Sequence, residues 1–87
     1  MILHTFNQPG ALSRHLELIQ PDDAVLLIED GVFDAPMLKA LDCREKCLLK
    51  RDLIARGLGE AQPNAIAISD AQWVALTIRC ERVASWS

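Results

Sequence analysis

The chain of 87 residues contains no tyrosine, two tryptophans and two phenylalanines, and it has no long apolar run. Runs such as Ala24–Ile28 are far shorter than the roughly 20 residues that a membrane-spanning helix needs, so we expect no contact with the membrane. The opening residues, Met1–Phe6, lack the charged n-region of a signal peptide. These absences predict a cytoplasmic protein.

The chain also lacks a large excess of one charge. Nine basic and twelve acidic residues give a net charge of −3, without a basic stripe. Direct nucleic-acid binding is therefore not expected. The sequence has no G-x-G-x-x-G or P-loop motif and no second cysteine or histidine pair at ligand spacing, so we expect neither a cofactor nor a metal. Its three cysteines, an odd number, fit reduced thiols better than a disulfide framework.

Apolar residues are abundant instead. They make up 51% of the chain, and the mean hydropathy is +0.14. A chain of this length forms one domain, residues 1–87, and buries only about 60% of the surface of its unfolded state. The excess of apolar residues therefore predicts an interface with other subunits.

Apolar patterning predicts alternating strands and helices. The strands are expected at 2–6, 24–28, 46–49 and 65–68, and the helices at 11–19, 34–41, 51–57 and 69–83. Short connections between alternating elements are typical of parallel strands with helices on both faces. The predicted fold class is therefore α/β: a small three-layer sandwich around a mainly parallel sheet of about four strands.

Local signals define two of these helices. Asp52 is expected to cap the first turn of the third helix, and Gly57 to end that helix in the left-handed conformation. Arg56 can bond the last carbonyl groups of that helix or a partner carboxylate. Ser69 and Gln72 match a capping box at the start of the last helix, whose apolar stripe is expected to run to Val83.

Two thiols are candidates for chemistry, Cys43 and Cys47. Arg44 and Lys46 flank Cys43, and their charges can lower the pKa of its thiol and make it a nucleophile. An incidental surface thiol is the simpler interpretation. Cys47 in a strand and Cys80 on an apolar helical stripe are expected to be core residues.

The remaining polar candidates are weak. His4 and His15 lie in separate elements with no nucleophile paired to either, so we expect both to be structural. Glu29 and Asp30 follow a central strand, where ligands of open α/β sheets usually bind. A turn that leaves the strand explains this acidic pair equally well. No residue is assigned as catalytic.

Several segments in order resemble the TusB/DsrH family of sulfur-relay proteins. The most specific is Asp-Leu-Ile-Ala-Arg-Gly-Leu, residues 52–58. The others are Met-Ile-Leu-His-Thr at 1–5, the strand end Leu-Leu-Ile-Glu-Asp-Gly-Val at 26–32, and the stretch from Ile68 to Trp86.

This resemblance implies a DsrE-like fold and one subunit of a TusBCD-type heterohexamer, with TusC-like and TusD-like partners. The complex would pass persulfide sulfur from a TusA-like to a TusE-like protein for 2-thiouridine formation at the tRNA wobble position. The family's sulfur-carrying cysteine belongs to the TusD subunit, and the matching place here, near Leu49–Lys50, has none.

The resemblance therefore implies a non-catalytic scaffold subunit. Two alternatives stay open. One is a cysteine-based sulfur carrier acting through Cys43 or Cys47. The other is a homo-oligomeric α/β binding module with an acidic mouth at Glu29–Asp30.

Overall fold

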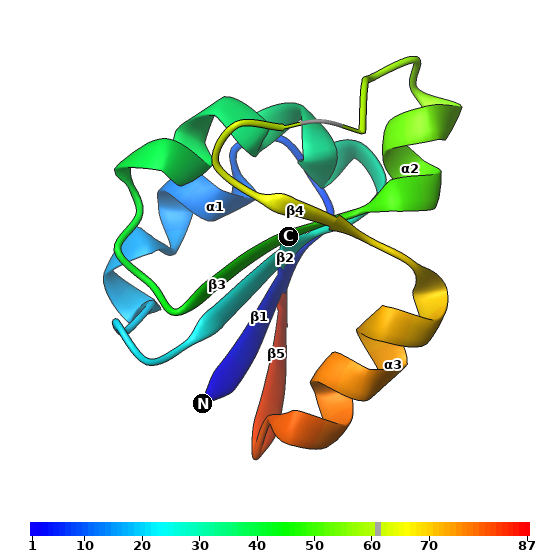
Figure 1. The fold of residues 1–87 in the computed structure, drawn as a ribbon. Helices are drawn as coiled ribbons and strands as arrows, with labels where there is room; N and C mark the ends of the chain where they lie inside the picture. Colours follow the sequence, from blue (N-terminus) through cyan, green and yellow to red (C-terminus); the bar gives the residue numbers. More distant parts are fainter. Residues whose placement is uncertain (61) are drawn as a thin grey trace.

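A computed structural model describes residues 1–60 and 62–87 and places five strands in one parallel sheet (Figure 1). The strands are β1 (Ile2–Phe6), β2 (Ala24–Leu27), β3 (Glu45–Leu49), β4 (Ile66–Ile68) and β5 (Arg82–Trp86). Their order across the sheet is β4-β3-β2-β1-β5. The chain thus builds the sheet in one direction from β1 to β4 and then crosses to the far side of β1.

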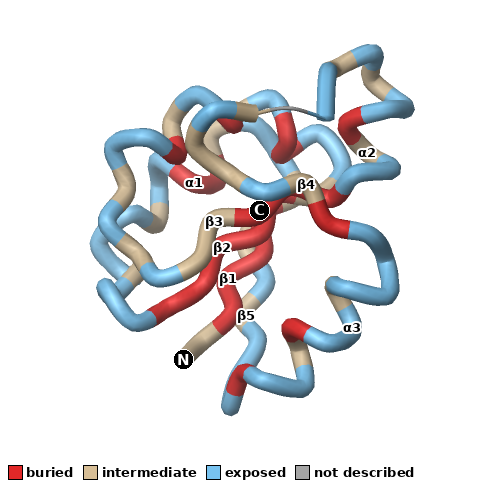
Figure 2. The backbone as a smooth tube through the Cα atoms, viewed as in Figure 1, coloured by how far each residue is buried: buried red, intermediate tan, exposed pale blue. Residues whose placement is uncertain are grey.

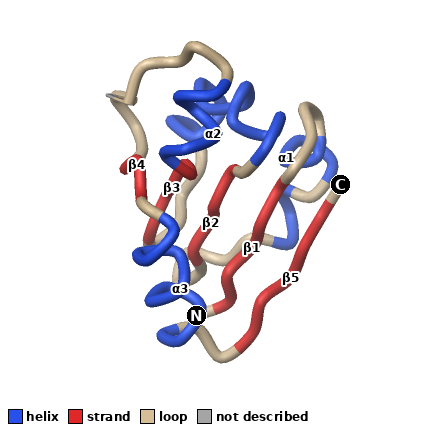
Figure 3. The backbone as a smooth tube through the Cα atoms, turned by 90° about the vertical axis from the view of Figure 1, so that its right-hand side faces the viewer, coloured by secondary structure: helices blue, strands red, loops and turns tan. Residues whose placement is uncertain are grey.

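Helices cover both faces of the sheet, which confirms the predicted three-layer α/β sandwich (Figure 3). The helical segments are α1 (Ala11–Arg14), the 3₁₀ turn η1 (Leu16–Leu18), the 3₁₀ run η2 (Glu29–Ala40), α2 (Lys50–Ala55) and α3 (Asp70–Arg79). Buried side chains of α1, η2 and α2 pack on one face, and those of α3 pack on the other. No helix in residues 1–60 or 62–87 has the length and apolarity to cross a bilayer.

The core lies on either side of β2, which is buried along its whole length (Figure 2). Alternate residues of a strand point to opposite faces. Val25 and Leu27 therefore join the cluster under α1, η2 and α2, while Ala24 and Leu26 join the cluster under α3. A strand covered on both faces reads as a continuous apolar run, and the sequence prediction for this strand is confirmed.

The expectation that the last helix continues to Val83 is wrong. The helix ends at Arg79, and Val83 lies in β5, which makes the sheet five-stranded rather than four-stranded. β5 pairs with β1 over its full length, from Ile2 opposite Arg82 to Phe6 opposite Trp86. This pairing joins the two ends of the chain. The five residues of β5 by themselves do not predict a pairing with so distant a strand.

The continuous helix predicted over 11–19 is also wrong. It divides at His15 into α1 and η1. The His15 ring bonds the carbonyl oxygen of Ala11 at 2.8 Å through Nδ1, and the His15 amide donates instead to Leu12. The side chain has taken the acceptor that an α-helix reserves for the amide of residue 15. Leu16, which begins η1, is exposed.

The second predicted helix begins earlier than expected. The 3₁₀ run starts at Glu29, directly after β2, and not near Asp34, and it ends at Ala40. Proline at position 36 has no amide hydrogen to donate, and the run continues past it as 3₁₀ turns. The early start depends on Asp52 in α2, whose side chain accepts the amide hydrogen of Glu29.

Two of the three predicted helix signals are present, the stop at Gly57 and the capping box at Ser69; the predicted cap at Asp52 is wrong. Gly57 has φ 69°, and its amide donates to Ile54 while the Leu58 amide donates to Leu53. This is the Schellman pattern that closes a helix on a left-handed residue. At α3, Ser69 Oγ accepts from the Gln72 amide and Gln72 Oε1 accepts from the Ser69 amide, so the capping box is confirmed.

Gly31 gives a direct test of the packing between η2 and β1. A Cβ at position 31 would lie 2.1 Å from the carbonyl oxygen and 2.8 Å from the carbonyl carbon of Phe6, and backbone atoms cannot move aside easily. We expect Gly31→Ala to lower the free energy of unfolding by about 3 kcal/mol or more. Gly59→Ala is the control, because a Cβ there meets nothing within 4 Å. Urea unfolding measures both, and equal stabilities would show that β1 and η2 are not in this contact.

Candidate functional site

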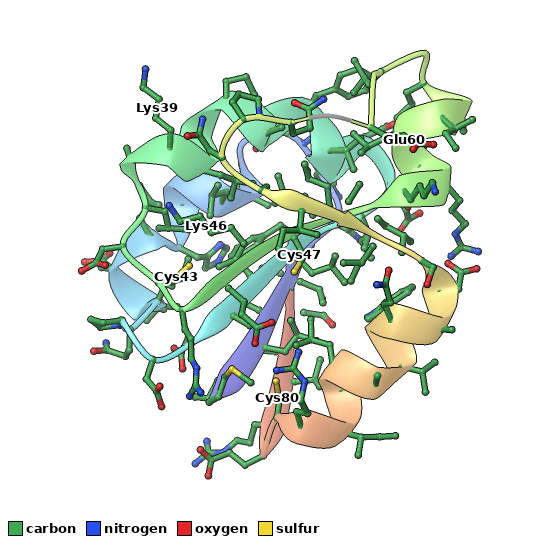
Figure 4. The ribbon with its side chains drawn as sticks, viewed as in Figure 1. Lys39, Cys43, Lys46, Cys47, Glu60 and Cys80 are labelled. Atoms are coloured by element: carbon green, nitrogen blue, oxygen red, sulfur yellow. The ribbon has the colours of Figure 1, made fainter. Side chains whose placement is uncertain are left out.

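The three cysteines come from different segments of the chain (Figure 4). Cys47 in β3 and Cys80 after α3 are buried in the cluster beneath α3, as predicted. Burial raises the pKa of the Cys47 thiol to about 11 and also raises the pKa of the Cys80 thiol. Both side chains are therefore neutral thiols at physiological pH and poor nucleophiles.

Cys43 precedes β3 and is half-buried rather than an exposed surface thiol. Burial raises the pKa of its thiol; the charge of Lys46 lowers it, but by less. Desolvation thus outweighs the neighbouring positive charge, which weighs against the activation that Arg44 and Lys46 could have given this thiol. The Cys43 thiol instead donates to the Glu45 carbonyl oxygen at 3.5 Å.

At the carboxyl ends of β2 and β3, the structure joins two segments that are far apart in sequence. Asp52 does not cap the helix in which it lies. Its Oδ2 accepts the amide hydrogen of Glu29 at 2.7 Å. Glu29 has φ 51°, a conformation that residues other than glycine rarely adopt. The Asp52 carboxylate thus holds the turn that starts η2 directly after β2.

Arg56 completes this cluster. Its Nε donates to Asp30 Oδ1 at 2.7 Å, and its Nη1 donates to the Asp52 carbonyl oxygen at 3.3 Å. Of the two partners predicted for Arg56, a carbonyl group of its own helix is confirmed, and the carboxylate that it bonds belongs to the same chain. Arg56 forms an ion pair with Asp30, so the acidic pair Glu29–Asp30, considered as the mouth of a binding module, lies at a junction between η2 and α2.

A second cluster lies on the sheet face beneath α1 and involves the two histidines. His4 Nε2 lies 3.0 Å from Asp23 Oδ2, and His4 Nδ1 accepts from Trp86 Nε1 at 3.1 Å. An indole nitrogen can only donate, so Nδ1 is the acceptor and Nε2 carries the proton toward Asp23. Both ring nitrogens are therefore occupied by hydrogen bonds within the fold, which fits the structural role expected for His4.

The histidines are less separate than the sequence indicates. The His15 ring stacks on Trp86 with centroids 4.5 Å apart, so Trp86 lies between it and His4. Sequence reasoning did not find Asp23 or this use of Trp86. The opening and closing segments of the family resemblance contain His4 and Trp86, and these segments were the sequence signal for the contact. The β1–β5 pairing brings them together.

The contacts of His4 with Asp23 and Trp86 stabilise the fold and leave no ring nitrogen free for catalysis. A histidine–carboxylate pair acts as a general base only when the second ring nitrogen can reach a reacting group, and in His4 Trp86 occupies that nitrogen. Near Leu49–Lys50, where the resemblance would place the family's sulfur-carrying cysteine, Leu49 is buried at the end of β3. Residues 1–60 and 62–87 contain no group of three or more side chains arranged to hold a metal ion.

The Asp23 carboxylate predicts a pH dependence. Burial raises the pKa of this carboxyl. Hydrogen bonds from the Gln20 amide, the His4 ring and the Ile2 amide together lower it by more, so the pKa of Asp23 lies below its usual value. A lowered folded-state pKa contributes stability that is present above the unfolded-state value of about 3.9 and is lost as pH falls through the folded-state value.

We expect Asp23→Asn to lower the free energy of unfolding by about 1–3 kcal/mol at neutral pH and to flatten the loss of stability below about pH 4. Glu17→Gln, which changes an exposed carboxyl on η1, is the matched control. Chemical unfolding at a series of pH values measures both. Equal acid slopes in Asp23→Asn and the parent chain would contradict the assignment.

Comparison with known proteins agrees with the resemblance. A family model described as DsrH like protein matches residues 7–83. Protein TusB of Yersinia pestis (strain Pestoides F) is 38% identical over 82 residues, which cover 86% of each chain. Protein TusB of Yersinia pseudotuberculosis (serotype O:1b) gives the same identity and coverage. The chain therefore belongs to the TusB/DsrH family.

Proposed function

We propose that this chain, as a single TusB/DsrH-like domain over residues 1–87, is a non-catalytic subunit of a TusBCD-type sulfur-relay complex in the cytoplasm. Its neighbours in the heterohexamer are TusC-like and TusD-like subunits. The complex takes persulfide sulfur from a TusA-like protein and gives it to a TusE-like protein for 2-thiouridine formation at the tRNA wobble position. The chain itself binds no nucleic acid and no cofactor.

The observation that carries this proposal is the state of the three thiols. Sulfur transfer needs a thiolate that a donor persulfide can reach. Cys47 and Cys80 are buried, and all three thiols have a raised pKa. A member of a sulfur-relay family without an activated thiol is suited to holding its partners rather than to carrying sulfur.

The loops at the carboxyl ends of the strands support a role in positioning partner loops. Parallel α/β sheets present their working loops at this edge, and here ion pairs and hydrogen bonds among Asp30, Asp52 and Arg56 hold the loops. The resemblance places the family's sulfur-carrying cysteine near Leu49–Lys50, and neither of these residues is a cysteine. A rigid edge without a nucleophile can present a fixed surface to the loop of a TusD-like subunit.

A cysteine-based carrier acting through Cys43 is the second candidate function. The observation in its favour is an open hollow lined by Cys43, Arg44, Lys46 and Asn64, among other residues. Two basic side chains beside a half-buried thiol are the setting in which a persulfide anion would be stabilised. The raised pKa of the Cys43 thiol in the isolated chain weighs against this candidate.

Substitution of the thiols separates the two functions. We expect Cys43→Ser to leave wobble-uridine thiolation unchanged in cells whose only copy is the variant, because the thiol is not part of the relay. Cys47→Ala and Cys80→Ala are expected to cost stability through lost packing, on the order of 1 kcal/mol each, and to leave thiolation intact wherever the complex assembles. Mass spectrometry of thiolated tRNA nucleosides is the measurement.

The control for that experiment is assembly. A tagged chain and its Cys43→Ser variant are purified from cells, and TusC-like and TusD-like subunits are identified by mass spectrometry. Loss of thiolation in Cys43→Ser with assembly preserved would establish the carrier function. A parent chain that captures neither subunit would refute the TusBCD-type complex itself.

A further inference from the structure

We draw no further inference here: the strongest candidate, the exposed apolar face of helix α3 at Val74 and Ile78, carries no proposal, because nothing in the described residues shows what covers it.

Discussion

The buried residue Asp23 is the interaction on which the sheet depends. Its carboxylate accepts hydrogen bonds from the Ile2 amide at the start of β1 and from the His4 ring, which in turn holds Trp86 of β5. Its carbonyl oxygen accepts the Arg44 amide, next to the start of β3. One residue at the start of β2 thus links four of the five strands. A buried carboxylate with several donors costs little, whereas the same donors without it would each lose a partner.

The carboxyl ends of the strands, at the other end of the sheet from Asp23, are held in a different way. There Asp52 and Arg56 on α2 bond the turn that leaves β2, and they keep Glu29 in a conformation that its own side chain disfavours. Such strain persists only where the surroundings over-determine it. Two of the segments that carry the resemblance to the TusB/DsrH family, residues 26–32 and 52–58, meet at this junction.

The distribution of apolar residues and thiols belongs to the same account. The cysteines fill small volumes in or beside the core, where desolvation keeps them protonated. Apolar residues in excess of the core are exposed in part on α3, at Val74 and Ile78. A small chain that exposes apolar surface of this kind is expected to cover it with another subunit. The proposed scaffold role and this exposed surface therefore fit the same composition.

Much of the local structure could be predicted from the sequence. The buried run of β2, the Schellman turn at Gly57 and the capping box at Ser69 each depend on residues within a few positions of one another, so the pattern contains the whole cause. The fold class followed from the alternation of such elements. The resemblance in several segments correctly indicated the family.

What only the tertiary structure decided are interactions between distant residues. β5 exists because its backbone groups pair with those of β1, 80 residues away in the register from Ile2 to Arg82. His15 divides a helix by taking a carbonyl oxygen, and Asp52 serves another element rather than its own. The charges around Cys43 were visible in the sequence, but the burial that outweighs them was not. Hydrogen bonding and desolvation depend on which residues the fold brings close together. The order of residues along the chain does not give these distances.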